Sequence, residues 1–113
     1  MDFAEELYVG ETVENLGTVV YSLRREIPVP RLYCMVLFYD RDRLEILSSR
    51  ELFTPKQKKR KGRIVGVAMG RQEVIDLFRY AAGQAAAEGR DMIRPQTWFG
   101  PCEKVDEGEG VSC

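Results

Sequence analysis

The segment 31–39, with the sequence RLYCMVLFY, constrains the fold more than any other part of the chain. Its apolar run of eight residues is too short for most helices and rich in aromatic and branched side chains, which predicts a central β-strand. Because successive side chains of a strand point to opposite faces, both faces of this strand are apolar. Other parts of the protein therefore have to cover both faces.

Three further strands are predicted around this one. The polar residues 40–43 form a turn, and residues 44–47 (LEIL) return as the second arm of a β-hairpin, with Glu45 facing the solvent. Residues 7–10 (LYVG) and 63–69 (RIVGVAM) have the composition of two more short strands. The sheet is therefore expected to have four strands.

The first predicted helix begins after Thr12 as N-cap, and its apolar residues recur at spacings of three and four as far as Ile27. Pro28 ends it. Gly17 and the stretch 18–21, which consists of β-branched residues and a tyrosine, leave a strand as the alternative for this segment.

A second helix is predicted from Arg71 to about Glu88, with Gly89 as its C-cap. Between the hairpin and the last strand, Ser48 and Glu51 have the spacing of a capping box, which predicts one helical turn over 49–53.

The order strand-helix-strand-strand-strand-helix predicts an α+β fold, a two-layer sandwich with a mixed four-stranded sheet and both helices on one face. Residues 1–93 are expected to form this single domain. Residues 94–113 are expected to form a C-terminal extension, in which Trp98 and Phe99 pack and the acidic end is mobile.

Two helices on one face leave the second face of the central strand without a cover. Either the segment around Trp98 folds over this face, or a second copy of the chain does, which predicts a homodimer or other self-association. The residues of this predicted self-association face are Tyr33, Met35, Leu37 and Tyr39.

The strongest charge feature is the run 56–63, in which six of eight residues are lysine or arginine. Such a loop attracts the phosphates of RNA or DNA, and Arg24 and Arg25 would extend it if they lie nearby. The alternative is a solvated loop that keeps the adjoining strand from pairing with other chains. The six candidate contacts are Lys56, Lys58, Lys59, Arg60, Lys61 and Arg63.

The residue types present disfavour catalysis and metal binding. The chain has no histidine, the commonest general base near neutral pH and a frequent zinc ligand. Cys34 lies among apolar residues and is predicted to be a buried structural thiol, while Cys102 and Cys113 lack ligand spacing. The step from Gly70 to Arg71 lacks the spacing of phosphate-binding loops and is interpreted as a tight turn. We therefore expect no enzyme, no metal and no cofactor.

Charge and hydropathy bear on partners and location. A net charge of −1 gives no overall attraction to nucleic acid or anionic lipid. No apolar run approaches the length of a membrane span, the first residues are acidic rather than basic, and three cysteines do not suggest a disulfide framework. A cytoplasmic protein without membrane contact is predicted.

Three packing motifs resemble those of a known group of proteins. They are Leu44-Glu45-Ile46 in the hairpin, Val65-Gly66-Val67-Ala68 in the last strand, and Glu73-Val74-Ile75-Asp76-Leu77 in the second helix. In these motifs the chain resembles small proteins of gut Firmicutes that have no assigned activity, over about residues 7–93. The resemblance implies a bacterial source and the same fold, and it identifies no site.

Two functions are compatible with these features. The first is a non-enzymatic interaction or regulatory module that associates with itself through the apolar second sheet face. The alternative is a nucleic-acid-binding module that uses the basic run.

Overall fold

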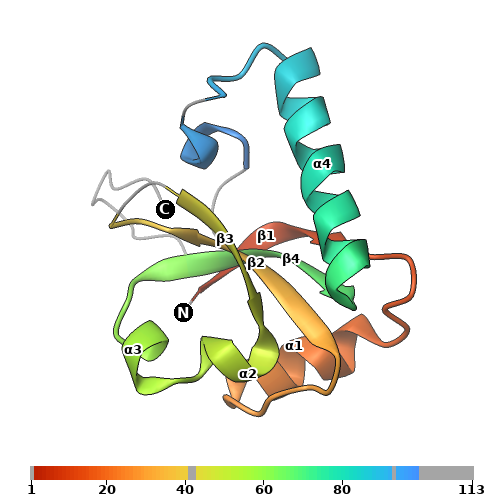
Figure 1. Ribbon diagram of the computed structural model, residues 1–113, viewed down its shortest axis with the longest axis vertical. Helices are drawn as coiled ribbons and strands as arrows, with labels where there is room; N and C mark the ends of the chain where they lie inside the picture. The colour runs from red at the N-terminus through yellow and green to blue at the C-terminus, as the bar shows by residue number, and fades with distance from the viewer. Residues whose placement is uncertain (1, 41–42, 93, 100–113) are drawn as a thin grey trace.

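The computed structural model describes residues 2–40, 43–92 and 94–99 (Figure 1). Within these residues the strands are β1 (Asp2–Val9), β2 (Leu32–Phe38), β3 (Arg43–Ser48) and β4 (Gly62–Met69). The longer helices are α1 (Leu16–Arg24) and α4 (Arg71–Ala87). Two one-turn helices, α2 (Ser49–Leu52) and α3 (Pro55–Lys58), connect β3 to β4, and a 3-10 turn follows at Pro95–Thr97.

The strands form one mixed sheet in the order β1-β4-β2-β3. β1 runs parallel to β4, whereas β2 runs antiparallel to both β4 and β3. The β2–β3 hairpin is regular, since every residue from Tyr33 to Phe38 has a partner in β3. The predicted α+β class, the mixed four-stranded sheet and the hairpin are confirmed.

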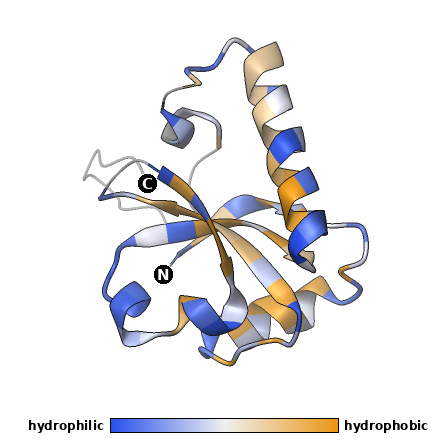
Figure 2. Cartoon of the chain, viewed as in Figure 1, coloured by the Kyte–Doolittle hydropathy of each residue, from blue (hydrophilic) through white to orange (hydrophobic). Residues whose placement is uncertain are grey.

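The predicted position of both helices on one face is wrong, because the helices lie on opposite faces (Figure 1). On one face α1 and α2 pack against the even-numbered side chains of β2, through Val19, Leu23 and Leu52. On the other face α4 packs against the odd-numbered side chains of β2. Figure 2 shows the apolar strands between these layers. The physical reason is the two-sided apolar character of β2, which needs a cover on each face.

The predicted self-association face lies inside the molecule. Met35 and Leu37 are fully buried, and Tyr33 is half-buried, under α4 and the segment that carries Trp98 and Phe99. Of that face, Tyr39 alone is exposed, by 37% of its surface. The apolar second face therefore gives no reason to expect a second copy of the chain. The acidic end of the predicted extension lies outside the described residues.

Helix α1 is shorter than predicted at both ends. Its N-cap is Asn15, whose side chain accepts a hydrogen bond from the Thr18 N–H (3.1 Å), and not Thr12. Past its C-terminus, Glu26 adopts a left-handed conformation (φ 61°), and the Ile27 N–H donates to the carbonyl oxygen of Ser22 (2.9 Å). This closure is a Schellman-type cap, which ends the helix before Pro28.

β1 begins at Asp2, five residues earlier than the predicted strand. Its pairing with β4 is interrupted between Phe3 and Tyr8, and the acidic residues Glu5 and Glu6 in this interruption are exposed. An irregular edge strand does not need alternating apolar side chains, so the composition of residues 2–6 does not indicate a strand.

The predicted capping box and the predicted second helix are confirmed. Ser48 and Glu51 form both hydrogen bonds of the capping box that starts α2. Helix α4 begins after Gly70 and ends at Ala87, followed by Gly89 in a left-handed conformation (φ 74°).

Candidate nucleic-acid interface

The basic run begins on α3, continues through the connection from α3 to β4 and ends on the first residues of β4. Helix α3 and this connection lie on the same side of the sheet as α1 and α2 (Figure 1). Helix α3 has no buried residue, and Figure 2 shows it as hydrophilic along its length. The six candidate contacts are nevertheless not equivalent, because tertiary contacts divide them into cations that face the solvent and cations that hold the fold together.

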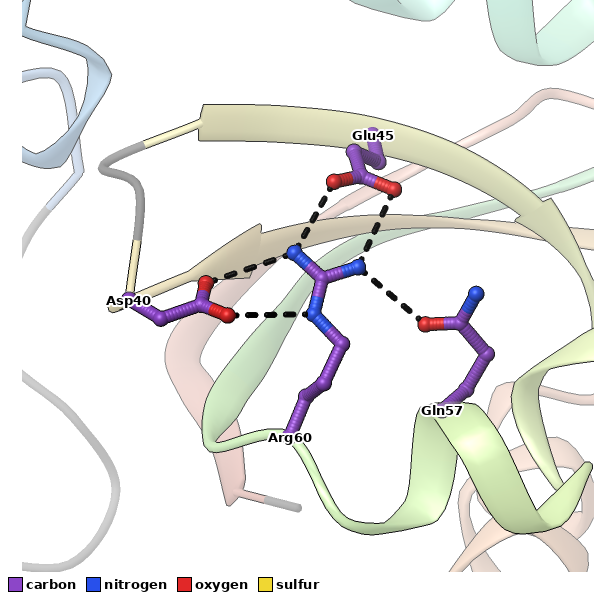
Figure 3. A network of polar contacts seen from close by, with 4 residues as sticks. All are labelled: Asp40, Glu45, Gln57 and Arg60. Atoms are coloured by element: carbon purple, nitrogen blue, oxygen red, sulfur yellow. Dashed lines mark hydrogen bonds and ion pairs between the residues drawn. The ribbon is translucent and has the colours of Figure 1, made fainter.

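Arg60 is the centre of a polar network that joins the α3–β4 connection to the β2–β3 hairpin (Figure 3). Its guanidinium donates to both Glu45 carboxylate oxygens (3.0 and 3.4 Å), to both Asp40 oxygens (3.3 and 3.3 Å) and to Gln57 Oε1 (3.2 Å). The same group lies 3.6 Å from the centre of the Phe38 ring, in cation–π geometry. Arg60 therefore holds the turn end of the hairpin, where β2 ends and β3 begins, next to the core residue Phe38.

The electrostatics of this network identify Arg60 as a structural residue. Hydrogen bonds to Glu45, and then to Asp40, raise the pKa of the Arg60 guanidinium above its ordinary value, so its charge persists. The predicted orientation of Glu45 toward open solvent is wrong, because this carboxylate binds Arg60 and its side chain is 28% exposed. Arg60 is already paired with two carboxylates and is not available to hold a phosphate.

We expect the substitution Arg60→Gln to lower the free energy of unfolding by about 1–2 kcal/mol, because it leaves Asp40 and Glu45 without their shared cation in a partly exposed site. Lys59→Gln, the matched change at an exposed neighbour, should alter stability by less than about 0.5 kcal/mol. Urea unfolding of both variants checks the difference. Equal effects would show that the network contributes nothing to the fold.

Arg63 is also unavailable as a nucleic-acid contact. It lies on β4 opposite Leu37 and is fully buried. A buried guanidinium cannot reach a phosphate without disturbing the sheet, so the prediction that includes Arg63 among the contacts is corrected.

The other four cations of the run are exposed. Lys56, Lys59 and Lys61 form no ion pair with any described residue. Lys58 binds Glu26 (2.7 Å), but both side chains are about half exposed, and such a surface pair contributes little stability. This ion pair places α3 beside the C-terminal end of α1.

The end of α1 adds further cations and an exposed ring to the same side. Arg24 lies over Phe3 (4.8 Å to the ring centre), and Arg25 lies over Tyr21 (5.1 Å). Tyr21 is 59% exposed, so an aromatic surface and a guanidinium face the solvent together. The ion pair between Lys58 and Glu26 brings α3 close to the end of α1 that carries Arg24 and Arg25. This agrees with the expectation that the two arginines extend the basic run.

Charge is unevenly distributed along the chain. Residues 21–63, which include the end of α1 and all of α2 and α3, contain 12 Lys and Arg against five Asp and Glu. Residues 64–113 contain five basic and eight acidic residues. We name the surface formed by the end of α1, α3 and the 59–61 connection the basic face. Although the net charge of the whole chain is near zero, the field at this surface is positive.

Glu73, in the first turn of α4, accepts several hydrogen bonds through its carboxylate. It accepts hydrogen bonds from the Thr12 N–H (2.8 Å), the Thr12 hydroxyl (2.7 Å) and the Met69 N–H (2.7 Å). Burial alone would raise the pKa of Glu73, but these hydrogen bonds together lower it. Thr12 is therefore not an N-cap, because it binds a residue 61 positions away, and Glu73 serves to hold the β1–α1 loop.

This pKa shift predicts a pH-dependent contribution to stability. The folded pKa of Glu73 lies below its ordinary value of 4.5, so its stabilisation is complete above that value and is lost as the pH falls through the folded pKa. We expect Glu73→Gln to lower the free energy of unfolding by about 1 kcal/mol near neutral pH, and by less under acid conditions. Urea unfolding of both proteins at several pH values checks this. A difference that does not change with pH would contradict the assigned role.

The remaining groups with possible chemistry are buried or dispersed. Cys34 is fully buried, as predicted, and burial raises the pKa of its thiol to about 12, so the reactive thiolate does not form near neutral pH. Across residues 2–40, 43–92 and 94–99, no group of three or more His, Cys, Asp and Glu side chains is arranged to hold a metal ion. None of the described helices combines the length and apolar character needed to cross a lipid bilayer.

Comparison of the chain with protein-family models, with curated proteins and with solved structures finds no match. The resemblance to the small proteins of gut Firmicutes therefore stays a prediction.

Proposed function

We propose that the protein is a non-enzymatic binding module whose basic face binds nucleic acid. The observation that carries this proposal is the exposure of Lys56, Lys59 and Lys61 without ion pairs to described residues, next to the end of α1. Cations that are not neutralised within the molecule release bound counterions when they contact phosphates, which is the main source of affinity for nucleic acid.

The separation of roles within the basic run supports this proposal. Arg60 and Arg63 stabilise the fold, while the lysines between and before them project from a hydrophilic helix and its connection. A loop that only needed solubility would not require a specific anchor. Here Arg60 holds the backbone between Lys59 and Lys61 against the hairpin, so these two lysines are displayed from a fixed position (Figure 3).

The first sequence-based hypothesis, self-association through the apolar sheet face, loses its physical basis because Met35 and Leu37 are buried by α4. An enzyme is not proposed, since the carboxylates of Glu45 and Glu73 are engaged in structural hydrogen bonds and the Cys34 thiol is buried.

The proposal is tested by a fluorescence anisotropy titration with a labelled oligonucleotide at low salt. The double variant Lys59→Gln, Lys61→Gln should bind about 10 to 100-fold more weakly than the wild type, because two phosphate contacts are lost. The matched control is Arg71→Gln, Arg79→Gln, which removes the same charge from exposed positions on α4, on the other face of the sheet. This control should retain wild-type affinity. No binding by the wild type at low salt, or equal losses in both variants, would reject the proposal.

A further inference from the structure

A second basic feature lies apart from α3, at the end of the sheet where β2 begins and β3 ends. A concavity of about 280 Å³ opens to solvent between the 28–31 loop and the start of α2. Arg31 and Arg50 line it, together with Tyr33 and Ser48, which form a cross-strand pair. Its volume is at the low end of the range for small-molecule sites, so a ligand that fits it is compact.

The two arginines bring positive charge that no acidic side chain among the described residues neutralises. Both are exposed, and no Asp or Glu of the described residues forms an ion pair with either of them. This contrasts with Arg60, which binds two carboxylates. Two arginines that line one concavity favour a ligand with several anionic oxygens, because guanidinium matches phosphate geometry through paired hydrogen bonds.

Hydroxyl groups complete the lining of the concavity. The Ser48 hydroxyl oxygen accepts the Glu51 N–H (3.2 Å), which leaves the hydroxyl proton to be donated elsewhere. Tyr33 supplies a phenol from the adjacent position across the sheet. Donors of this kind, next to cations, are what an oxyanion needs to replace its hydration shell.

The loop that carries Arg31 is held rigidly. The buried Ser49 hydroxyl donates to the Val29 carbonyl oxygen (2.7 Å) and accepts the Val29 N–H (2.9 Å). The Arg31 carbonyl oxygen accepts the Gly70 N–H (2.8 Å), which ties the loop to the start of α4. Proline at positions 28 and 30 restricts the loop further. A site that is formed before binding loses less conformational entropy when a ligand arrives.

Arg31 occupies a backbone conformation that arginine disfavours. Its φ of 67° is left-handed, a region that glycine adopts without steric cost. A position with these angles is most stable with glycine or asparagine, so the presence of arginine needs a reason other than stability. Strained positions of this kind are concentrated at ligand sites.

We propose that Arg31 and Arg50, with Tyr33 and Ser48, form a binding site for a compact phosphate-class anion, either free phosphate or the phosphoryl group of a small monoester. This site goes beyond the proposed function, because it uses none of the lysines of the basic face. It binds one anion per chain and involves no covalent step.

The experiment is an NMR titration of the full chain with inorganic phosphate, in parallel with a small alkyl phosphomonoester and with acetate. Phosphate should shift the amide signals of residues 31–33 and 48–50 in a saturable manner, while signals of α4 past its first turn stay in place. Tighter binding of the monoester than of free phosphate identifies an ester as the source of the phosphoryl group, and the reverse identifies free phosphate. Acetate binding as tightly as either, or shifts spread over all cationic surfaces, would overturn the site.

The backbone strain allows a sharp variant test. Arg31→Gly should weaken phosphate binding about tenfold or more, because one charge-assisted contact is lost, while the melting temperature does not fall. Arg50→Gln should weaken binding to a similar degree. The matched control is Glu26→Gly. Glu26 is the other non-glycine residue with a left-handed backbone among the described residues (φ 61°), and its replacement should leave phosphate binding intact.

Two outcomes separate this site from the basic face. Lys59→Gln, Lys61→Gln should bind phosphate like the wild type, even though it binds the oligonucleotide more weakly. Arg31→Gly with unchanged phosphate affinity would contradict the site and leave the proposed nucleic-acid interface unaffected.

Discussion

Replacing Trp98 with alanine is expected to lower the free energy of unfolding by about 3–5 kcal/mol, the range for removal of a buried aromatic side chain. Trp98 packs with Phe78 and Phe99 (ring centres 6.3 Å apart in each pair) on the face of the sheet that also carries Met35. Its indole N–H donates to the Asp91 carbonyl oxygen (2.9 Å), which fixes the segment after α4. The side chain thus contributes both apolar burial and a directed hydrogen bond.

Denaturant unfolding of Trp98→Ala measures this loss, and light scattering gives a second readout. Because the substitution uncovers part of the apolar second face, the variant is expected to self-associate at concentrations where the wild type does not. Tyr21→Ala is the control, since Tyr21 is an aromatic residue that is largely exposed on α1. Its loss should cost less than about 1 kcal/mol and should not cause association. Similar losses in the two variants would mean that Trp98 does not cover the core.

The substitution Gly62→Ala is expected to destabilise the sheet by about 3 kcal/mol, at the upper end of the effects of overpacking. A Cβ at position 62 would lie 2.6 Å from the carbonyl oxygen of Leu37 and 3.2 Å from the Cα of Phe38. Both neighbours are backbone atoms of the paired strand β2, so neither can move without disturbing the β2–β4 ladder. The conflict cannot be relieved by a rotamer change.

Gly83→Ala is the matched control for the same chemical change. Gly83 lies on the exposed side of α4, and an added Cβ would meet nothing within 4 Å. Alanine there should stabilise the protein by about 0.5–1 kcal/mol, because glycine loses more conformational freedom in a helix. Thermal or urea unfolding should therefore shift in opposite directions for the two variants. A shift in the same direction would contradict the packing around Gly62.

The parts of the fold that depend on local pattern could be predicted from the sequence. The apolar run of β2, the capping box at Ser48 and Glu51, and the glycines beside α4 all act within a few residues of their own position. The start of α1 could not be predicted in this way, because Thr12 resembles an N-cap but binds Glu73 on a distant element. The local preference of a threonine for the N-cap position is overridden where a distant residue offers it stronger hydrogen bonds.

The candidate site was only partly predictable for the same reason. The basic run was evident as a cluster of charge, but Lys59 and Arg60 look alike in sequence and differ in role. Arg60 lies within reach of Asp40 and Glu45 only after the hairpin has formed. The two apolar faces of β2 predict that each face needs a cover, but they do not indicate whether a helix, the C-terminal segment or a second copy of the chain provides it.

Arg31 and Arg50 were not singled out in the sequence. They are 19 positions apart, and neither belongs to a charged run. Proline at positions 28 and 30 indicates a loop, but the sequence does not show the left-handed conformation of Arg31 or the hydrogen bond from the Gly70 N–H to its carbonyl oxygen.

The most direct test of the proposed function is the dependence of oligonucleotide affinity on salt concentration. For the wild type, the logarithm of the association constant should fall linearly with the logarithm of salt concentration. The slope should be shallower by about two in Lys59→Gln, Lys61→Gln, roughly one for each lysine, and unchanged in Arg71→Gln, Arg79→Gln. The same slope in all three proteins, or an affinity that does not respond to salt, would contradict a nucleic-acid interface on the basic face.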